Sequence, residues 1–296
     1  MIKQIFETFS PSGNEDCMRE LLKCQLSGIF EKIETDNIGN LIASSGNGGL
    51  CIECGMDSTG IMVVSKNDSQ AYFASVGAVK PVELADRRIV FANGTTGVVK
   101  YNEDLDLKSA KISDLYVEMD TENVNIGDFG TVDSEFNEDE CAFSGYGLKG
   151  RIGLAAVCSA LKSAREVENT TILFSAQKRL GARGVRGFFG SRKFDNVITV
   201  DACCNDGCSV IAKDARAVAS LEIRTELEKI ASENDLDAET VVCDDDFFIE
   251  QVLISDNTCG AVGVSVLCED DEPQRVNKTD FDTAVNLLTA VLNKNR

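Results

Sequence analysis

The chain has 296 residues, of which 43% are hydrophobic and 26% charged, a composition typical of a globular protein with a substantial core. The net charge is -20, so the sequence shows no basic surface of the kind that binds nucleic acids or anionic membranes. This argues against both as partners. No histidine occurs anywhere in the sequence. The composition therefore excludes Ser-His-Asp and Cys-His catalytic arrangements and removes the commonest metal ligand.

The sequence carries no sign of export or of membrane insertion. The first residues, MIKQIFETFSPSGNED, contain no apolar run long enough for the core of a signal peptide. No stretch approaches the ~20 apolar residues of a membrane helix. We therefore expect a cytoplasmic protein whose 12 cysteines are reduced thiols.

The N-terminal part predicts one helix and then strands. Ser12 and Glu15 form an S-x-x-E capping box, so a helix is expected to follow to about residue 30. Its inward face would carry Met18, Leu21, Leu22, Leu26 and Ile29. Strand-like segments follow in the order KIETD, NLIAS, LCIEC and GIMVVS.

From about residue 66 to 144 the pattern changes to short apolar runs between turn residues, with no helical pattern of useful length. This segment predicts a small all-β domain inserted into a larger fold.

After residue 150 helices and strands alternate, which predicts a mostly parallel sheet covered by helices. Helices are expected at 151–166, 182–191 and 219–234. Thr279 is expected to cap a last helix, with Phe281, Val285, Leu288 and Leu292 on its inward face. Strands are expected at TILFSA, NVITVD, ETVVC and VGVSVL. The predicted fold is an α/β domain, residues 1–65 and 145–296, interrupted by the β domain at 66–144.

Ligand sites of α/β proteins lie in loops at the carboxyl ends of parallel strands. Three such loops carry polar residues, at 53–57, 177–181 and 201–204. The segment 146–151 joins them because it returns the chain from the β domain.

The order of several motifs resembles the tetrahedral (deblocking, glutamyl) aminopeptidases, which are di-zinc peptide hydrolases of the phosphorylase/hydrolase-like type. The matching segments are SPSGNED, DNIGNLIA, GMDSTGIMV, FASVGAVKPVELADRRIVF, DLYVEMDTENVNIGDFGTVDSEF, GLKGRIGLAAV and ILFSAQKRLGARG. They run in order from about residue 5 to the last helix. The resemblance implies that the inserted β domain is a small barrel that mediates dimerisation.

The resemblance also shows which family residues this chain lacks. The family's zinc-binding histidine, bridging aspartate and metal-binding glutamate fall at Gly55, Lys149 and Arg179. Its catalytic glutamate falls at Lys178, and its last histidine near Asp270. Two aspartates survive: Asp57 beside the first position, and Asp201, a metal ligand in the family.

Cations at these positions would repel a divalent metal rather than bind it. We therefore expect no catalytic residue, no bound metal and no cofactor, with ion pairs among Asp57, Asp201, Lys149, Lys178 and Arg179 in place of zinc. An anionic ligand bound by Lys149, Lys178, Arg179 and Asp201 is a second interpretation. The structural interpretation is preferred, because paired charges are more often structural than functional.

The cysteines provide a rival site. Cys54, Cys203 and Cys204 follow neighbouring strand ends and could form a soft-metal or redox centre. Against this, the two thiols of Cys51-x-x-Cys54 would point to opposite faces of a strand. The acidic run Asp244–Asp246 is interpreted as a solvated loop.

The function expected from these observations is that of an aminopeptidase homologue, inactive as a metallopeptidase, with a binding, regulatory or assembly role. The alternatives are a hydrolase with altered chemistry using Lys178 or a cysteine, and a metallopeptidase reduced to Asp57, Asp201 and the acids at 269–271. The resemblance implies a homo-oligomer, a dimer through the inserted domain or something larger. It also allows co-assembly with an active paralogue.

Overall fold

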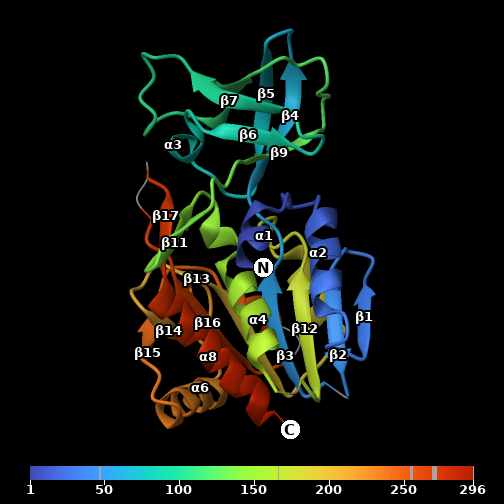
Figure 1. Cartoon of the computed structure of the whole chain (residues 1–296), viewed down its shortest axis with the longest axis vertical. Helices are drawn as coiled ribbons and strands as arrows, with labels where there is room; N and C mark the ends of the chain where they lie inside the picture. The colour runs from blue at the N-terminus through green and yellow to red at the C-terminus, as the bar shows by residue number, and fades with distance from the viewer. Residues whose placement is uncertain (47, 166, 254–255, 269–271, 296) are drawn as a thin grey trace.

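A computed structural model describes the whole chain except residues 47, 166, 254–255, 269–271 and 296 (Figure 1). It contains an α/β domain and a closed barrel. The barrel lies beyond the end of the domain toward which β3 and β12 point (Figure 1). None of the helices in the described part combines the length and apolar character needed to cross a bilayer.

The α/β domain is built on an eight-stranded sheet. Four of its seven strand pairings are parallel, which confirms the predicted mostly parallel sheet. In spatial order the strands are β1 (Lys32–Thr35), β2 (Leu41–Ser45), β12 (Thr170–Ser175), β3 (Leu50–Gly55), β13 (Asn196–Cys203), β16 (Cys259–Ser265), β14 (Cys208–Lys213) and β15 (Ala238–Val242).

Helices cover both faces of this sheet. One face packs against apolar side chains of α1 (Ile2–Glu7), α2 (Asp16–Leu26), α4 (Ile152–Ser163), α6 (Leu221–Glu233) and α8 (Lys278–Lys294). The other face packs against α5 (Arg183–Phe189) and α7 (Ile249–Leu253). A Cβ on Gly153 of α4 would lie 2.7 Å from the carbonyl oxygen of Val200, so the glycine permits close approach of α4 to β13.

The inserted segment folds as a six-stranded closed barrel with its own apolar core. Its strands are β4 (Gly60–Lys66), β5 (Gln70–Val76), β6 (Arg88–Phe91), β7 (Thr96–Tyr101), β8 (Leu115–Glu118) and β9 (Phe129–Val132). The helix α3 (Pro81–Leu84) and the 3-10 helix η1 (Ile112–Asp114) lie between barrel strands in the chain. The first barrel strand starts at Gly60, before the predicted boundary at residue 66. Dimerisation through this domain stays a prediction.

A third, three-stranded sheet joins the returning chain to the C-terminal part. It consists of β10 (Asn137–Glu138), β11 (Ala142–Gly145) and β17 (Gln274–Asn277). The 3-10 helix η2 (Leu148–Gly150) follows β11 in the chain. The elements β14, β17 and α1 were not expected from the sequence.

Two predicted helix starts are wrong. Glu15 is itself the N-cap of α2, and no side-chain capping bond forms there, because the Glu15 carboxylate accepts hydrogen bonds from the backbone N–H groups of Gly13 and Gln177 instead. The last helix is capped by Asn277, not by Thr279, which lies in its first turn. The inward face predicted for that helix is confirmed, since Phe281, Val285, Leu288 and Leu292 are buried.

Candidate functional site

The four loops predicted to carry the site lie together at the carboxyl edge of the sheet. Lys178 from the loop after β12 reaches Glu53 on β3 and Asp201 on β13. The Nη2 atom of Arg179, the next residue, lies 3.5 Å from the carbonyl oxygen of Gly150. The sequence prediction that these strand ends converge is therefore confirmed by direct contacts.

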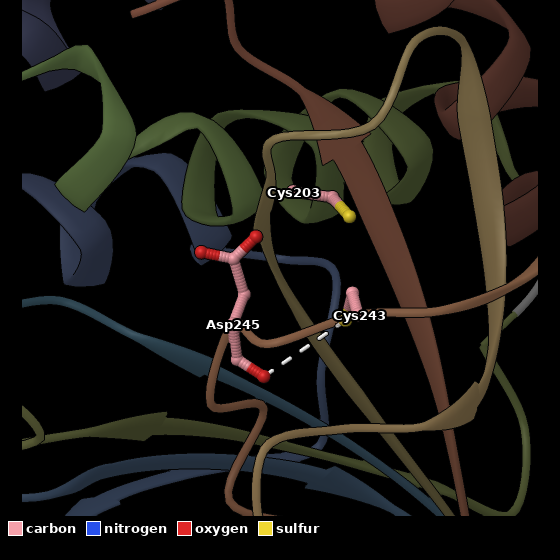
Figure 2. Close-up of side chains that lie close together, drawn as sticks. All are labelled: Cys203, Cys243 and Asp245. Carbon is pink, nitrogen blue, oxygen red and sulfur yellow. Dashed lines mark hydrogen bonds between the residues drawn. The ribbon is translucent and has the colours of Figure 1, made fainter.

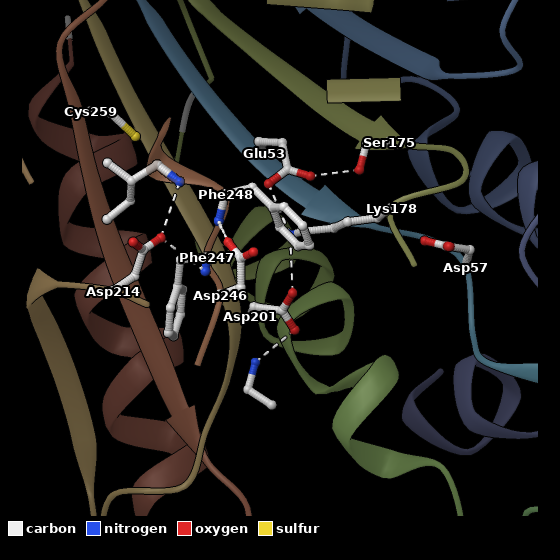
Figure 3. Close-up of polar contacts among 12 residues, drawn as sticks. Glu53, Asp57, Ser175, Lys178, Asp201, Asp214, Asp246, Phe247, Phe248 and Cys259 are labelled. Atoms are coloured by element: carbon white, nitrogen blue, oxygen red, sulfur yellow. Dashed lines mark hydrogen bonds and ion pairs between the residues drawn. The ribbon is translucent and has the colours of Figure 1, made fainter. Parts of the chain in front are cut away.

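Lys178 lies at the centre of the site (Figure 3). Its Nζ is 3.0 Å from Glu53 Oε2 and 3.1 Å from Asp201 Oδ2, and its side chain is 0% exposed. Glu53 is equally buried and accepts a second hydrogen bond, from Ser175 Oγ at 2.6 Å. The ring of Phe248 covers the ammonium group, with its centroid 5.2 Å from Nζ. The lysine thus bridges two carboxylates out of reach of solvent.

Arg179 joins the same cluster by two routes. Its Nη2 lies 3.1 Å from Asp201 Oδ1, which is the second ion pair of that carboxylate. Its backbone N–H donates to Asp57 Oδ2 at 2.8 Å, so Asp57 is held by the main chain of the loop rather than by a side-chain cation. The expected ion pairs of Asp201 with Lys178 and Arg179 are therefore present.

The charges of this buried cluster control its protonation. Burial would lower the pKa of Lys178, but the Asp201 and Glu53 carboxylates outweigh burial and raise that pKa above its ordinary value. Burial likewise acts to raise the pKa of Asp201, and Arg179 and Lys178 reverse this and lower it. At Glu53 and Asp57 burial prevails and raises the pKa. Lys178 is thus a fixed cation at neutral pH and a poor proton acceptor.

Gly55 ends β3 beside this cluster and has no room for a side chain. A Cβ at this position would lie 2.7 Å from Cδ of Lys178 and 3.4 Å from Asp57 Oδ1. The aliphatic part of Lys178 therefore fills the space that a longer residue at position 55 would need.

Lys149 does not join the ion pairs of Asp201, contrary to the expectation that it would. Its Nζ lies 2.8 Å from Asp245 Oδ1 and 3.1 Å from Cys204 Sγ. Asp245 therefore does not belong to a merely solvated run, because it also accepts the backbone N–H of Cys204 at 2.9 Å. Asp270, the last of the positions carried over from the resemblance, lies outside the described residues.

The thiol of Cys204 is exposed and adjoins a cation. A hydrogen bond with Cys268 has the largest influence on the pKa of Cys204. Together with the contact from Lys149 it outweighs partial burial and lowers this pKa to about 6. Cys204 is therefore largely a thiolate at neutral pH.

The rival grouping of Cys54 with Cys203 and Cys204, which the sequence did not favour, does not form. Cys54 packs in the core on the face covered by α4 and α8, whereas Cys51 and Cys203 pack on the face covered by α5 and α7. The alternation of side chains along a strand separates them. Cys203 instead lies near Cys243 and Asp245, a group that the sequence did not indicate.

Three contributors to the site were missed because their partners lie far away in the sequence. Glu15 holds the N–H of Gln177, a residue with a positive φ of 52°, and Asn40 Oδ1 accepts the N–H of Ala176 at 2.8 Å. The guanidinium of Arg151 is buried and donates from Nη2 to Ser10 Oγ and Ser58 Oγ, each at 3.2 Å. These contacts tie the N-terminal segment to the strand-end loops.

Solved structures with the same fold include aminopeptidases. An aminopeptidase of the archaeon Desulfurococcus kamchatkensis superposes with a TM-score of 0.90 at 17% identity, covering 99% of this chain and 93% of that one. The TET1 peptidase of Pyrococcus horikoshii superposes with a TM-score of 0.86 at 22% identity, covering 98% and 97%. That peptidase can assemble into a tetrahedron or a large octahedral shell. These likenesses define the class of the fold, that of the TET aminopeptidases.

The sequence relatives agree with the fold. A putative aminopeptidase of Acetivibrio thermocellus is 25% identical over 321 aligned positions, which cover 99% of this chain and 97% of the relative. The putative aminopeptidase FrvX of Escherichia coli is 24% identical, over 68% of this chain and 63% of the relative. The model of the M42 glutamyl aminopeptidase family matches residues 39–245. The chain therefore belongs to the M42 glutamyl aminopeptidase family.

Proposed function

We propose that this chain is a member of the family that does not act as a metallopeptidase and instead has a binding, regulatory or assembly role. The observation that carries the proposal is the position of Lys178, whose Nζ lies between the Glu53 and Asp201 carboxylates. In the family, by the resemblance described above, zinc neutralises the surviving aspartates. Here the side-chain cations of Lys178 and Arg179 compensate Asp201, while Asp57 accepts the backbone N–H of Arg179.

The residues present do not fit a two-metal centre. Lysine and arginine at 178 and 179 bring positive charge to positions where a divalent ion needs anionic donors, and arginine offers no lone pair. Gly55 offers no donor, and the stem of Lys178 leaves no space beside it. Asp57 and Asp201 already accept hydrogen bonds from Arg179.

Two of the rival functions, anion binding and an altered hydrolase, have less support. Anion binding needs free cations, but Lys149, Lys178 and Arg179 each pair with a carboxylate of the protein. A hydrolase that used Lys178 as its base would need the neutral amine, yet the carboxylates around it raise its pKa. Both observations favour a structural role for the cluster.

For the assembly role, the proposed arrangement is a homo-oligomer that uses the barrel. Large apolar side chains are exposed there, at Val64, Tyr72 and Ile126, the last with 68% of its surface accessible. Exposed apolar side chains of this size can be covered by a contact between subunits. Light scattering of the Ile126→Glu variant tests this, because loss of the oligomer is expected and an unchanged mass would contradict it.

The inactive state is tested with chromogenic aminoacyl substrates in the presence of added cobalt. The chain should stay at the background rate while an active family member run in parallel turns over. Turnover that rises with cobalt and disappears with a chelator would contradict the proposal and support the reduced metallopeptidase instead.

A further inference from the structure

A group of soft and hard donor atoms lies beside the lysine cluster, and the proposed function does not use it. Cys203 ends β13, Cys243 directly follows β15, and Asp245 lies two residues further along (Figure 2). One sulfur from each cysteine and one carboxylate oxygen all lie within 4.8 Å of one another. Cys203 and Cys243 are both buried, and Asp245 is half-buried.

The backbone holds these donors in place. Cys243 donates its N–H to the carbonyl of Lys213 at 3.1 Å, and the carbonyl of Cys203 accepts from Val266 at 2.9 Å. The loop that carries Asp245 is held by the buried Asp214, whose Oδ2 accepts the N–H groups of Phe247 and Ile249 (Figure 3). A site fixed by a sheet and a braced loop needs little rearrangement on binding.

The two buried thiols make only modest contacts of their own. Cys243 Sγ approaches the carbonyl oxygens of Lys213 and Asp245 at 3.9 Å, and Cys203 Sγ approaches Asn205 Oδ1 at 3.1 Å. Thiols are weak hydrogen-bond donors, so a metal that displaces their protons breaks only weak hydrogen bonds.

We propose that Cys203, Cys243 and Asp245 form a binding site for one thiophilic metal ion, of which Zn²⁺ is the divalent example. Cys204 borders this site, with Sγ 3.7 Å from Asp245 Oδ1, but is not one of the donors that all lie within 4.8 Å of one another. Two sulfurs and one carboxylate oxygen are a donor set that suits zinc and not magnesium or calcium.

The charge around the site supports this assignment. Two thiolates and one carboxylate around Zn²⁺ leave an excess of negative charge. Lys149 Nζ donates to both Asp245 Oδ1 and Cys204 Sγ, so a cation is already in place to offset it. Such outer contacts orient ligands and tune affinity. Neither Asp57 nor Asp201 belongs to this site, and the proposal does not depend on whether the chain is catalytically inactive.

Cobalt is the probe of choice, because cobalt bound to thiolate gives a near-ultraviolet charge-transfer band that carboxylate-bound cobalt does not give. The full chain, reduced and kept free of oxygen, is titrated with Co²⁺ and then with Zn²⁺. We expect the band to saturate at one Co²⁺ per chain and to be abolished by one equivalent of Zn²⁺. No band, or saturation at another stoichiometry, would overturn the proposal.

Variants locate the metal. Cys243→Ser should weaken Zn²⁺ binding by more than about tenfold and remove the band, and Asp245→Asn, at a half-buried position, should also weaken binding if the first variant does not fold. Cys141→Ser, at an exposed thiol outside the group, is the matched control and should bind as the parent does. A band that survives both Cys243→Ser and Asp245→Asn, or that is lost in Cys141→Ser, would overturn the assignment.

Discussion

The Nζ of Lys178 lies 3.0 Å from Glu53 Oε2, and both side chains are completely buried. An ion pair of this kind gains stability only while both partners are present, because each charge alone would be left without compensation in a dry interior. Asp201, 3.1 Å from the same Nζ, extends the arrangement to a lysine between two carboxylates. This relationship determines the stability, the packing and the proposed loss of metal chemistry at the site.

Replacing Lys178 by methionine should destabilise the fold by about 3–5 kcal/mol, the usual cost of leaving buried charges unpaired. Urea unfolding measures the change. Lys193→Met is the matched control, because Lys193 pairs with Asp256 on the surface, where loss of an ion pair costs about 0–1 kcal/mol.

The same pair should show strong coupling in a double-mutant cycle. The variant that combines Glu53→Gln with Lys178→Met should lose less stability than the sum of the two single variants, since the second change removes a charge that the first left unpaired. Additive losses would contradict the ion pair as the main interaction of Glu53.

Gly55→Ala should cost about 1–3 kcal/mol, because its Cβ would lie 2.7 Å from a lysine stem that two carboxylates hold in place. Gly150→Ala is the control, since a Cβ there would meet its nearest atoms at 3.7 Å, an ordinary contact. Both variants are compared by thermal and urea unfolding. Equal stability of the two would show that Lys178 moves aside freely.

Cys204 should be the fastest thiol to react with iodoacetamide at neutral pH, because contacts with Cys268 and Lys149 lower its pKa to about 6. The rate should fall as the pH drops through that value, when the thiolate becomes protonated. Lys149→Met removes the cation and should slow the reaction, whereas Cys141 in the same protein should react at an unchanged rate. Mass spectrometry of peptides measures both, and a Cys204 rate that Lys149→Met leaves unchanged would contradict the account.

Much of the fold could be predicted from the sequence, because strand-helix alternation and the order of the motifs are local signals. The convergence of Lys178, Arg179 and Asp201 followed from the rule that parallel strands end at one edge. Glu53 was not singled out, since an acidic residue inside an apolar strand becomes meaningful only when its buried partner is known. The partners Lys149 and Asp245 lie 96 positions apart, and no periodicity links them.

The wrong expectations share one cause, which is competition from tertiary contacts. Glu15 has the spacing of a capping residue but binds the N–H of Gln177, far along the chain. Cys54 and Cys203 follow neighbouring strand ends, yet the direction of each side chain places them on opposite faces of the sheet. Such choices depend on which partner the fold supplies.

The most direct test of the central claim is anomalous scattering at the zinc edge from crystals grown with excess Zn²⁺. The account predicts no zinc peak bound by Asp57 or Asp201, with the Lys178 ammonium still between Glu53 and Asp201. Zinc at the thiols of Cys203 and Cys243 would be compatible with it. Two zinc ions ligated by Asp57 and Asp201, with Lys178 displaced, would contradict it.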